Sequence, residues 1–251
     1  MYGFQSINTN GDTVVLDRAN TFYYLGQASV FSTDLAPVFF TDVRSSRVTY
    51  QITSPNGYPL VFIENIDGQR MTIQSLFLVS GTTYRFVIEM NNTTIPRAFC
   101  FGQTSPTTIG NPTDYSMVLY DSAGQITFDG TRDLLYDPAI AVWTGPSTAN
   151  TGTQITIQLN SMNVLAVSGT VPSSSATLMA ANALVITRTF DSVNLQFVTA
   201  SFAGGIYKSG GILYSCWVKE TATAPGGSAG VGQYNVGLSQ NIQVIDITRY
   251  T

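Results

Sequence analysis

The feature that most constrains this sequence is how often its apolar runs are interrupted. Short stretches of alternating apolar and polar residues follow one another along almost the whole chain, separated by turn residues roughly every 8 to 12 positions. Residues 8–11, 55–57 and 67–68 are such turns, rich in Asn, Asp, Gly and Pro. Residues 176–184 are the one helix-like stretch, and nine residues are too few for a stable isolated helix. This pattern predicts an all-β, antiparallel fold of the sandwich or barrel type.

The expected strands cover both halves of the chain. They are residues 4–7, 13–16, 22–31, 38–40, 48–52, 60–63, 71–79, 84–90, 117–120, 126–128, 140–143, 155–159, 164–167, 193–199, 212–218 and 242–247.

A repeated hairpin pattern suggests how these strands are organised. Residues 2–11 align with residues 115–124, and both segments begin with Tyr, carry Asn or Asp at the seventh position and end with Gly. An Asx-Gly turn between two short strands is a hairpin signal, although any β protein contains several. We interpret the repeat as two tandem β-sandwich-like domains, residues 1–112 and 113–251, joined by the polar connector 102–114. Residues 221–232 form a Gly-rich stretch that we expect to be an exposed loop or arm of the second domain.

Composition excludes several classes of function. The chain has 11 Lys and Arg against 15 Asp and Glu, a net charge of −4, and only two lysines, so a phosphate-binding basic patch is not expected. It has no histidine, which removes Ser-His-Asp triads and His-ligated zinc. No apolar run approaches the roughly 20 residues of a membrane span, and residues 1–6 lack the features of a secretory signal.

Uncharged polar residues take the place of charges. Charged residues make up 10% of the chain, whereas Thr, Ser, Asn and Gln together make up about a third of it. A surface of this kind repels other copies weakly, and lysine and glutamate are the residues usually depleted at interfaces. The composition therefore fits either an assembling protein or a β-rich protein in which Thr is common as a strand former.

Few residue clusters carry recognisable chemistry. Residues 129–137 hold three carboxylates that could bind Ca²⁺, but their spacing is not that of an EF-hand and Arg132 lies among them. Glu64, Glu89 and Glu220 are far apart in sequence, which disfavours a glycoside hydrolase. The sequence therefore predicts no enzyme, no metal and no cofactor.

Three further motifs have a structural interpretation beside a functional one. Gly204-Gly205 and Gly210-Gly211 lack the Gly-Lys-Ser/Thr of a phosphate loop, so we expect a hairpin or bulge there. Residues 91–94 contain glycosylation sequons, and we interpret them as an Asn-rich turn. Trp143, at the end of an expected strand, is our candidate for an exposed aromatic that could contact a sugar.

The repeat also carries a resemblance to a known family. Residues 115–129 (YSMVLYDSAGQITFD) resemble a Tyr-Gly strand-turn-strand segment found in small structural proteins of tailed bacteriophages, with Ser116 in place of the usual Gly. The resemblance covers about forty residues, together with the two-part layout. It implies a virion component, most simply in the tail region, and it carries over no catalytic residue.

The resemblance sets the expected function. We expect a non-enzymatic structural component of a phage virion, assembled in the bacterial cytoplasm as a homo-oligomer, with a trimer favoured, and in contact with other virion proteins. A capsid decoration protein and a module that binds a host-surface carbohydrate or receptor are the alternatives, and neither nucleic acid nor a membrane is expected as a partner. The family resemblance does not decide between a location on the tail and a location on the capsid.

The two cysteines could form one long-range disulfide or remain thiols. Cys100 and Cys216 are both flanked by aromatic residues, as buried thiols often are. Structural disulfides rarely persist in a reducing cytosol. We therefore predict two free thiols, one in each of the two domains.

Overall fold

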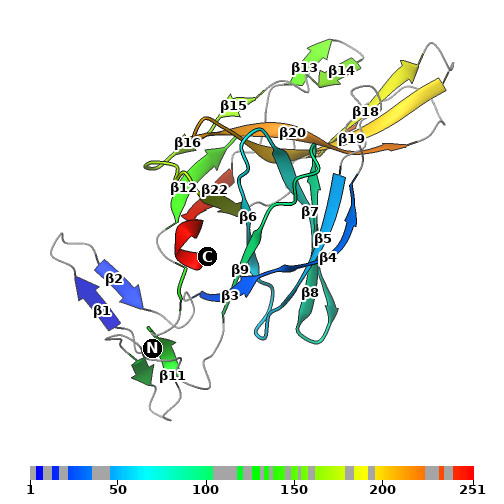
Figure 1. Cartoon of the computed structure of the whole chain (residues 1–251). Helices are drawn as coiled ribbons and strands as arrows, with labels where there is room; N and C mark the ends of the chain where they lie inside the picture. Colours follow the sequence, from blue (N-terminus) through cyan, green and yellow to red (C-terminus); the bar gives the residue numbers. More distant parts are fainter. Residues whose placement is uncertain are drawn as a thin grey trace.

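The structure, a computed structural model, describes most of the chain. The described residues are 4–7, 13–16, 22–35, 46–103, 118–120, 126–130, 133–135, 138–144, 148–151, 154–157, 162–178, 184–191, 196–223, 232–234 and 240–251. Within these ranges regular structure is almost entirely β (Figure 1), which confirms the predicted all-β class. No helix among these residues is long and apolar enough to cross a membrane.

The strands lie on both sides of residue 104. Those before residue 104 are β1 (Phe4–Ile7), β2 (Thr13–Leu16), β3 (Tyr23–Gln27), β4 (Ser29–Asp34), β5 (Ser46–Thr53), β6 (Leu60–Glu64), β7 (Arg70–Ser80), β8 (Thr83–Met90) and β9 (Ala98–Gly102). Those after it are β10 (Val118–Tyr120), β11 (Ile126–Asp129), β12 (Ala139–Trp143), β13 (Thr148–Thr151), β14 (Gln154–Ile157), β15 (Asn163–Val164), β16 (Ala166–Val167), β17 (Ser175–Leu178), β18 (Leu184–Asp191), β19 (Gln196–Ser209), β20 (Ile212–Thr223), β21 (Gly232–Tyr234) and β22 (Gln240–Asp246), followed by the 3-10 helix η1 (Ile247–Tyr250).

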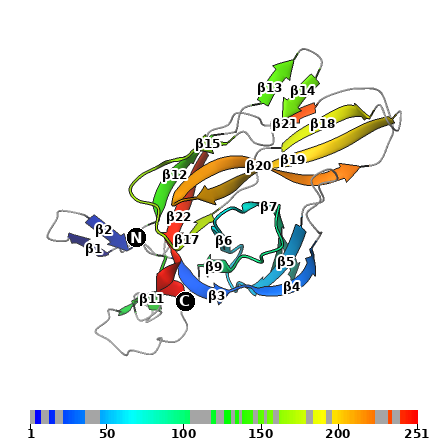
Figure 2. The ribbon, with the colours of Figure 1, turned by 45° about the horizontal axis from the view of Figure 1, so that its top comes forward.

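Two antiparallel sheets make up the body of the molecule. The seven-stranded sheet has the order β16-β12-β22-β17-β6-β9-β3. The nine-stranded sheet follows the path β15-β20-β19-β7-β8-β5-β4, with β18 and β21 attached beside β19. In Figure 2 strands β3, β9 and β6 of the first sheet face β7, β5 and β4 of the second, so that together they enclose the centre of the molecule.

The main core lies between the two sheets. Along β5 buried and partly exposed residues alternate, and the buried ones, such as Val48 and Tyr50, face inward. Tyr50 stacks on Phe86 of β8, with ring centroids 5.2 Å apart. From the opposite sheet, Val61 and Cys100 contribute to the same buried cluster. The period-2 pattern of the sequence therefore corresponds to one inward face on each sheet.

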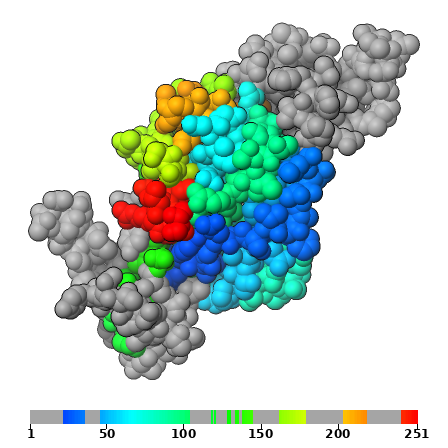
Figure 3. All heavy atoms as spheres, viewed as in Figure 1, coloured from blue at the N-terminus to red at the C-terminus, as the bar shows by residue number. Residues whose placement is uncertain are grey.

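A second apolar cluster covers the outer face of the seven-stranded sheet. Phe62, Phe99 and Phe101 alternate along β6 and β9 with residues of the main core, so these two strands are buried on both faces. Ile247 and Tyr250 of η1 pack on them, and the Tyr250 ring lies 5.0 Å from that of Phe101. Figure 3 shows this C-terminal segment (red) beside the residues of β3 (dark blue). The chain thus uses its own C-terminus to shield this face.

The predicted division into domains 1–112 and 113–251 with separate cores is wrong for the described residues. β6 pairs with β17, and β7 pairs with β19 through Met71 and Ile206, so both sheets combine strands from the two halves. The main core likewise unites residues such as Phe86 and Trp217. The physical reason is that β6 and β9 are apolar on both faces. They therefore need paired strands and apolar side chains packed on both faces, and the first half of the chain does not supply all of these. Most of the predicted connector, from residue 104 onward, lies outside the described residues.

The repeated motif does form two hairpins. β1 pairs with β2, and β10 pairs with β11, each as an antiparallel two-stranded sheet separate from the body. Both lie at the same end of the molecule (Figure 1). The prediction that the same hairpin occurs twice is therefore confirmed. The turns themselves lie outside the described residues, and the hairpins do not mark the start of two domains.

The expected helix-like stretch and Gly-rich loop are only partly described. Residues 175–178 are strand β17 and β18 begins at Leu184, so the described ends of the stretch 176–184 are strand. β20 extends to Thr223 and β21 begins at Gly232, and residues 224–231 of the expected loop lie outside the described part.

Candidate interaction surface

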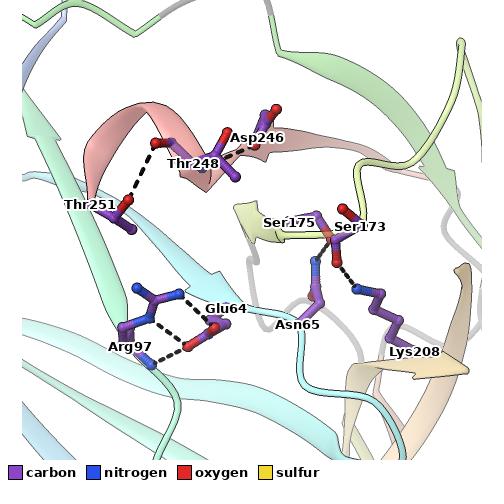
Figure 4. A network of polar contacts seen from close by, with 9 residues as sticks. All are labelled: Glu64, Asn65, Arg97, Ser173, Ser175, Lys208, Asp246, Thr248 and Thr251. Carbon is purple, nitrogen blue, oxygen red and sulfur yellow. Dashed lines mark hydrogen bonds and ion pairs between the residues drawn. The ribbon is translucent and has the colours of Figure 1, made fainter.

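Two regions of the structure are candidates for a functional site. One is a polar network at the junction of the two halves, and the other is an exposed stripe on the nine-stranded sheet. The network begins with Glu64, the last residue of β6. Arg97 donates to it twice from its guanidinium, at 2.8 and 3.0 Å, and once from its backbone N–H, at 3.1 Å (Figure 4). These hydrogen bonds lower the pKa of the Glu64 carboxyl and raise that of Arg97. Glu64 is therefore held ionised, which suits a structural ion pair and not a general acid.

The rest of the network joins residues that are far apart in sequence. The Asn65 amide donates to the Thr177 hydroxyl at 2.8 Å and to the Ser175 hydroxyl at 3.1 Å. The buried Lys208 side chain donates to the carbonyl oxygen of Ser173. Figure 4 shows the contacts of Asn65 with Ser175 and of Lys208 with Ser173, which link segments at or next to β6, β17 and β19. The network satisfies polar groups where strands of the two halves meet, so its role is to fix their pairing.

The predicted acidic candidates do not converge. Glu89 on β8 is fully buried and forms an ion pair with Arg47, while Glu64 lies on the other sheet with Arg97. Asp129 is fully buried and Asp133 is exposed, and Asp137 lies outside the described residues, as does the side chain of Glu220. Among the described residues no group of three or more His, Cys, Asp or Glu side chains is placed to hold a metal ion.

Trp143 is not the exposed aromatic that the sequence suggested. Its side chain is 3% exposed, and its indole N–H donates to the carbonyl oxygen of Gly205 at 3.2 Å. The prediction was wrong because β12 lies inside the seven-stranded sheet, and the residue at its end faces the main core.

The glycine-rich segment is a hairpin, as predicted. Gly210 and Gly211 have φ values of +55° and +80°, which the two-residue turn between β19 and β20 requires. At Gly205 a Cβ atom would lie 2.4 Å from the carbonyl oxygen of Met71, so glycine is needed where β19 approaches β7.

The asparagine-rich segment 91–94 is a turn, as predicted. The Asn92 side chain accepts a hydrogen bond from the backbone N–H of Thr94 at 2.8 Å, and that of Asn91 accepts one from Arg70 at 2.9 Å. Both bonds use the amide side chain to satisfy nearby backbone groups.

The cysteines are buried free thiols, as predicted. Cys100 and Cys216 are both fully buried, and burial raises the pKa of each to about 12. Such thiols are neutral at physiological pH and unreactive while the protein is folded. Their predicted assignment to two different domains does not apply, because they contribute to one shared body.

The exposed region that the sequence did not reveal is an aromatic and cationic stripe on the nine-stranded sheet. We call Phe31, Gln51, Phe77 and Arg85 the outer stripe. Arg85 lies with its guanidinium carbon 3.5 Å from the centre of the Phe31 ring, and its Nε donates to the Gln51 side chain at 3.0 Å. Phe77 is directly opposite Arg85 in the pairing of β7 with β8. Phe31 and Phe77 are 53% and 43% exposed.

The outer stripe continues along two open strand edges. Every residue of β4 is exposed, and β7 pairs with β19 only through Arg70 and Met71, which leaves its later residues without a paired strand on that side within the described residues. Val30 of β4 and Leu35 just after it, with Leu78 and Val79 on β7, add further exposed apolar area. The signal in the sequence was the apolar run 76–79, which is equally consistent with a buried strand. Only the strand order shows that it is an edge.

Comparison with protein families, with characterised proteins and with solved structures finds no match to this chain. Any functional conclusion therefore depends on the sequence and on the surface described above.

Proposed function

We propose that this chain is a non-enzymatic structural subunit of a bacteriophage virion that works by binding other protein subunits. The outer stripe is the observation that supports the proposal most directly. It presents two phenylalanines beside an arginine on an exposed β surface, and no described residue covers it. Contiguous exposed apolar area on a protein marks a binding surface, and aromatic residues with arginine are the types enriched at protein interfaces.

The chemistry of the interior supports a structural role. Glu64 is ion-paired with Arg97, and the hydrogen bonds from Arg97 lower its pKa, whereas a catalytic acid requires a raised pKa. Glu89 is fully buried and ion-paired with Arg47. The buried free thiols are compatible with assembly in a reducing bacterial cytoplasm. The resemblance of residues 115–129 to tail-region proteins favours the tail over a decoration on the capsid.

Assembly into a homo-oligomer follows from the same surface. The chain has two lysines and a net charge of −4, so repulsion between copies is weak and the edges of its sheets lack the usual lysine protection. We propose a closed symmetric oligomer, with threefold symmetry as the arrangement favoured for a virion appendage.

Electron microscopy tests the virion location. Particles from the source phage are labelled with gold-conjugated antibody against the full chain, and we expect label at one end of the tail. Label spread over the capsid would instead support the decoration role. Absence of the chain from purified particles, by both labelling and mass spectrometry, would contradict the proposal.

A carbohydrate- or receptor-binding role is the second candidate, and one observation favours it. Phe31, Arg85 and Gln51 place an aromatic ring, a cation and an amide side by side, which are the groups that contact sugar rings and their substituents. A glycan array with the wild-type chain and with Phe31→Ala tests this role. Saturable binding that is lost in the variant would favour it over purely structural assembly.

A further inference from the structure

Strand β4 has one side that nothing in the described chain pairs with. It lies at the end of the nine-stranded sheet and bonds only to β5, and Figures 1 and 3 show it on the flank of the molecule. By contrast, β3 at the end of the other sheet is bonded on its far side, because Tyr24 donates to Asp133 and Leu135 to Phe22. The unpaired N–H and C=O groups of a strand edge are a template for a further strand.

A bulge gives β4 an unusual order of faces. In its pairing with β5, Val30 is opposite Tyr50 and Ser32 is opposite Thr49, which leaves Phe31 as the extra residue. Tyr50 faces the core, so Val30 takes the inward face, whereas Phe31 contacts Arg85 on the outer face.

The remaining positions follow from the same register. Ser29, Ser32 and Asp34 are opposite the outward residues Gln51, Thr49 and Arg47, and Thr33 is opposite the buried Val48. From residue 29 to residue 34 the faces therefore read outer, inner, outer, outer, inner, outer. This order is the same in both directions along the strand.

We propose that β4 pairs antiparallel with β4 of a second copy of this chain, about a twofold axis between Phe31 and Ser32. The pairing places Ser29 opposite the partner's Asp34, Val30 opposite the partner's Thr33 and Phe31 opposite the partner's Ser32. Because the order of faces is palindromic, each outward residue meets an outward residue, as an isologous contact requires. In a strand without a bulge the two faces alternate regularly, so only a stretch with an odd number of residues would have a palindromic order of faces. The proposal names the contact behind the assembly role proposed above and rests on it.

The charges on the two copies are complementary in this register. Arg85 bonds to Gln51 and stacks on Phe31 but forms no ion pair, and Asp34 makes no ion pair either, within the described residues. Ser29, Gln51 and Arg85 form one row across β4, β5 and β8. The partner's Asp34 extends this row, on the side to which the Arg85 side chain reaches. Two symmetric Arg85–Asp34 pairs would then give each subunit a counter-charge for an arginine that lacks one.

The contact is short, so it is weak by itself. Six residues a side bury less than the roughly 800 Å² per partner of a standard specific interface. Such a contact becomes effective when other contacts hold subunits side by side, as in a symmetric assembly. Combined with a threefold contact elsewhere on the chain, a twofold contact produces a dihedral assembly.

Crosslinking through one introduced cysteine tests the axis, since the native Cys100 and Cys216 are fully buried. Across a twofold axis between residues 31 and 32, the two copies of residue 32 have Cα atoms roughly 6 Å apart and lie on one face, whereas the two copies of residue 33 are roughly 11 Å apart. A disulfide needs Cα atoms about 4.4–6.8 Å apart. We therefore expect Ser32→Cys to form a covalent dimer under mild oxidation, and Thr33→Cys, the matched control, to remain monomeric on a non-reducing gel. Equal crosslinking of both variants, or of neither, would overturn the proposed register.

Charge reversal tests the ion pair in the full chain. Sedimentation equilibrium should show at least about a tenfold weaker dimer for Arg85→Asp and for Asp34→Arg, and recovery to within about threefold of wild type in the double variant. Asp67→Arg makes the same change in net charge as Asp34→Arg at an exposed site between β6 and β7, and it should leave dimerisation unchanged.

The outcomes separate this proposal from the proposed function. If the wild type associates but the double variant shows no recovery, the β4 contact is wrong and the assembly role stands. If the wild type stays monomeric and is absent from virions, the assembly role itself fails.

Discussion

The outer faces of the two sheets differ in how far the chain covers them. On the seven-stranded sheet the aromatic residues Phe62, Phe99 and Phe101 are fully buried, because η1 and its neighbours cover them. On the nine-stranded sheet Phe31 and Phe77 stay about half exposed beside Arg85. Both faces carry aromatic side chains, but only one is covered by the described part of the chain.

This difference separates a surface that the chain covers itself from the surface that we propose as a binding surface. Apolar area that the chain covers itself contributes to the free energy of unfolding, at roughly 25 cal/mol per Å². Apolar area left exposed does not contribute to the free energy of unfolding, but it stabilises a complex when another molecule covers it. Mutations on the covered face should therefore change stability, and mutations on the bare face should change association. The following predictions, from the largest effect to the smallest, test that separation.

Removing residues 247–251 should have the largest effect. Ile247 and Tyr250 are buried, and the Tyr250 hydroxyl donates to the carbonyl oxygen of Leu134 at 2.8 Å. Their loss would expose the aromatic cluster on β6 and β9, and we expect the free energy of unfolding to fall by about 4 kcal/mol or more. Urea denaturation followed by fluorescence measures this. Removal of the exposed Thr251 alone is the control and should cost less than about 0.5 kcal/mol; a similar small cost for the full truncation would show that η1 does not shield the sheet.

Phe101→Ala should destabilise the covered face by about 3–5 kcal/mol, because it leaves a cavity in a fully buried cluster. The Phe101 ring packs edge-on against both Phe62 and Tyr250, at centroid distances of 5.5 and 5.0 Å. The midpoint of chemical denaturation reports the change, and Phe101→Leu, which keeps most of the volume, should recover much of it. A loss below about 1 kcal/mol would mean that this face is not closely packed.

Glu64→Gln should cost about 1 kcal/mol at neutral pH, a moderate value because the ion pair with Arg97 is partly exposed. Hydrogen bonds from Arg97 lower the pKa of Glu64 in the folded state. The ionised carboxylate therefore stabilises the fold above its unfolded pKa, and this contribution is lost as pH falls through the lower folded pKa. The stability difference between wild type and variant should shrink steadily on acidification below about pH 4.5. A difference that does not change with pH would argue against an ion pair in solution.

Phe31→Ala and Phe77→Ala should have the smallest effect on stability, about 1 kcal/mol, because about half of each side chain is already exposed to solvent. Their effect should appear in association, as weaker dimerisation in sedimentation experiments. Denaturation of the same samples at low concentration provides the comparison. A stability loss as large as that of Phe101→Ala would show that residues outside the described part cover the outer stripe, and would remove the contrast between the two faces.

The strand content could be predicted from the sequence because it depends on local pattern. Residues 48–52, 60–63 and 84–90 alternate or run apolar between clear turn signals, and each is a strand at nearly those bounds. The hairpin at Gly210-Gly211 and the Asn-rich turn at residues 91–94 were also predictable, since turn residues act within a few positions. The thiols were predictable from their aromatic neighbours.

The domain division and the exposed aromatic could not be predicted in the same way. Two hairpins with the same motif suggested two domains, but hairpins are local and say nothing about which distant strands pair. Trp143 and Phe77 both stand in apolar segments, yet the first is buried and the second exposed. The difference depends on the neighbours of β12 and β7 in the sheets, and strand order depends on contacts far apart in sequence.

The sequence by itself determined the class of fold, the positions of strands and turns, and the absence of histidine chemistry, because alternation, turn preference and residue type act over a few neighbouring positions. The tertiary structure alone decided that the two halves share one core, that η1 covers one outer face, and that no described residue covers β4 and the outer stripe on the other. These outcomes depend on pairings such as β6 with β17 and β7 with β19, which connect residues more than a hundred positions apart. A periodic pattern fixes which face of a strand is apolar, but only the assembled sheets fix whether anything covers it.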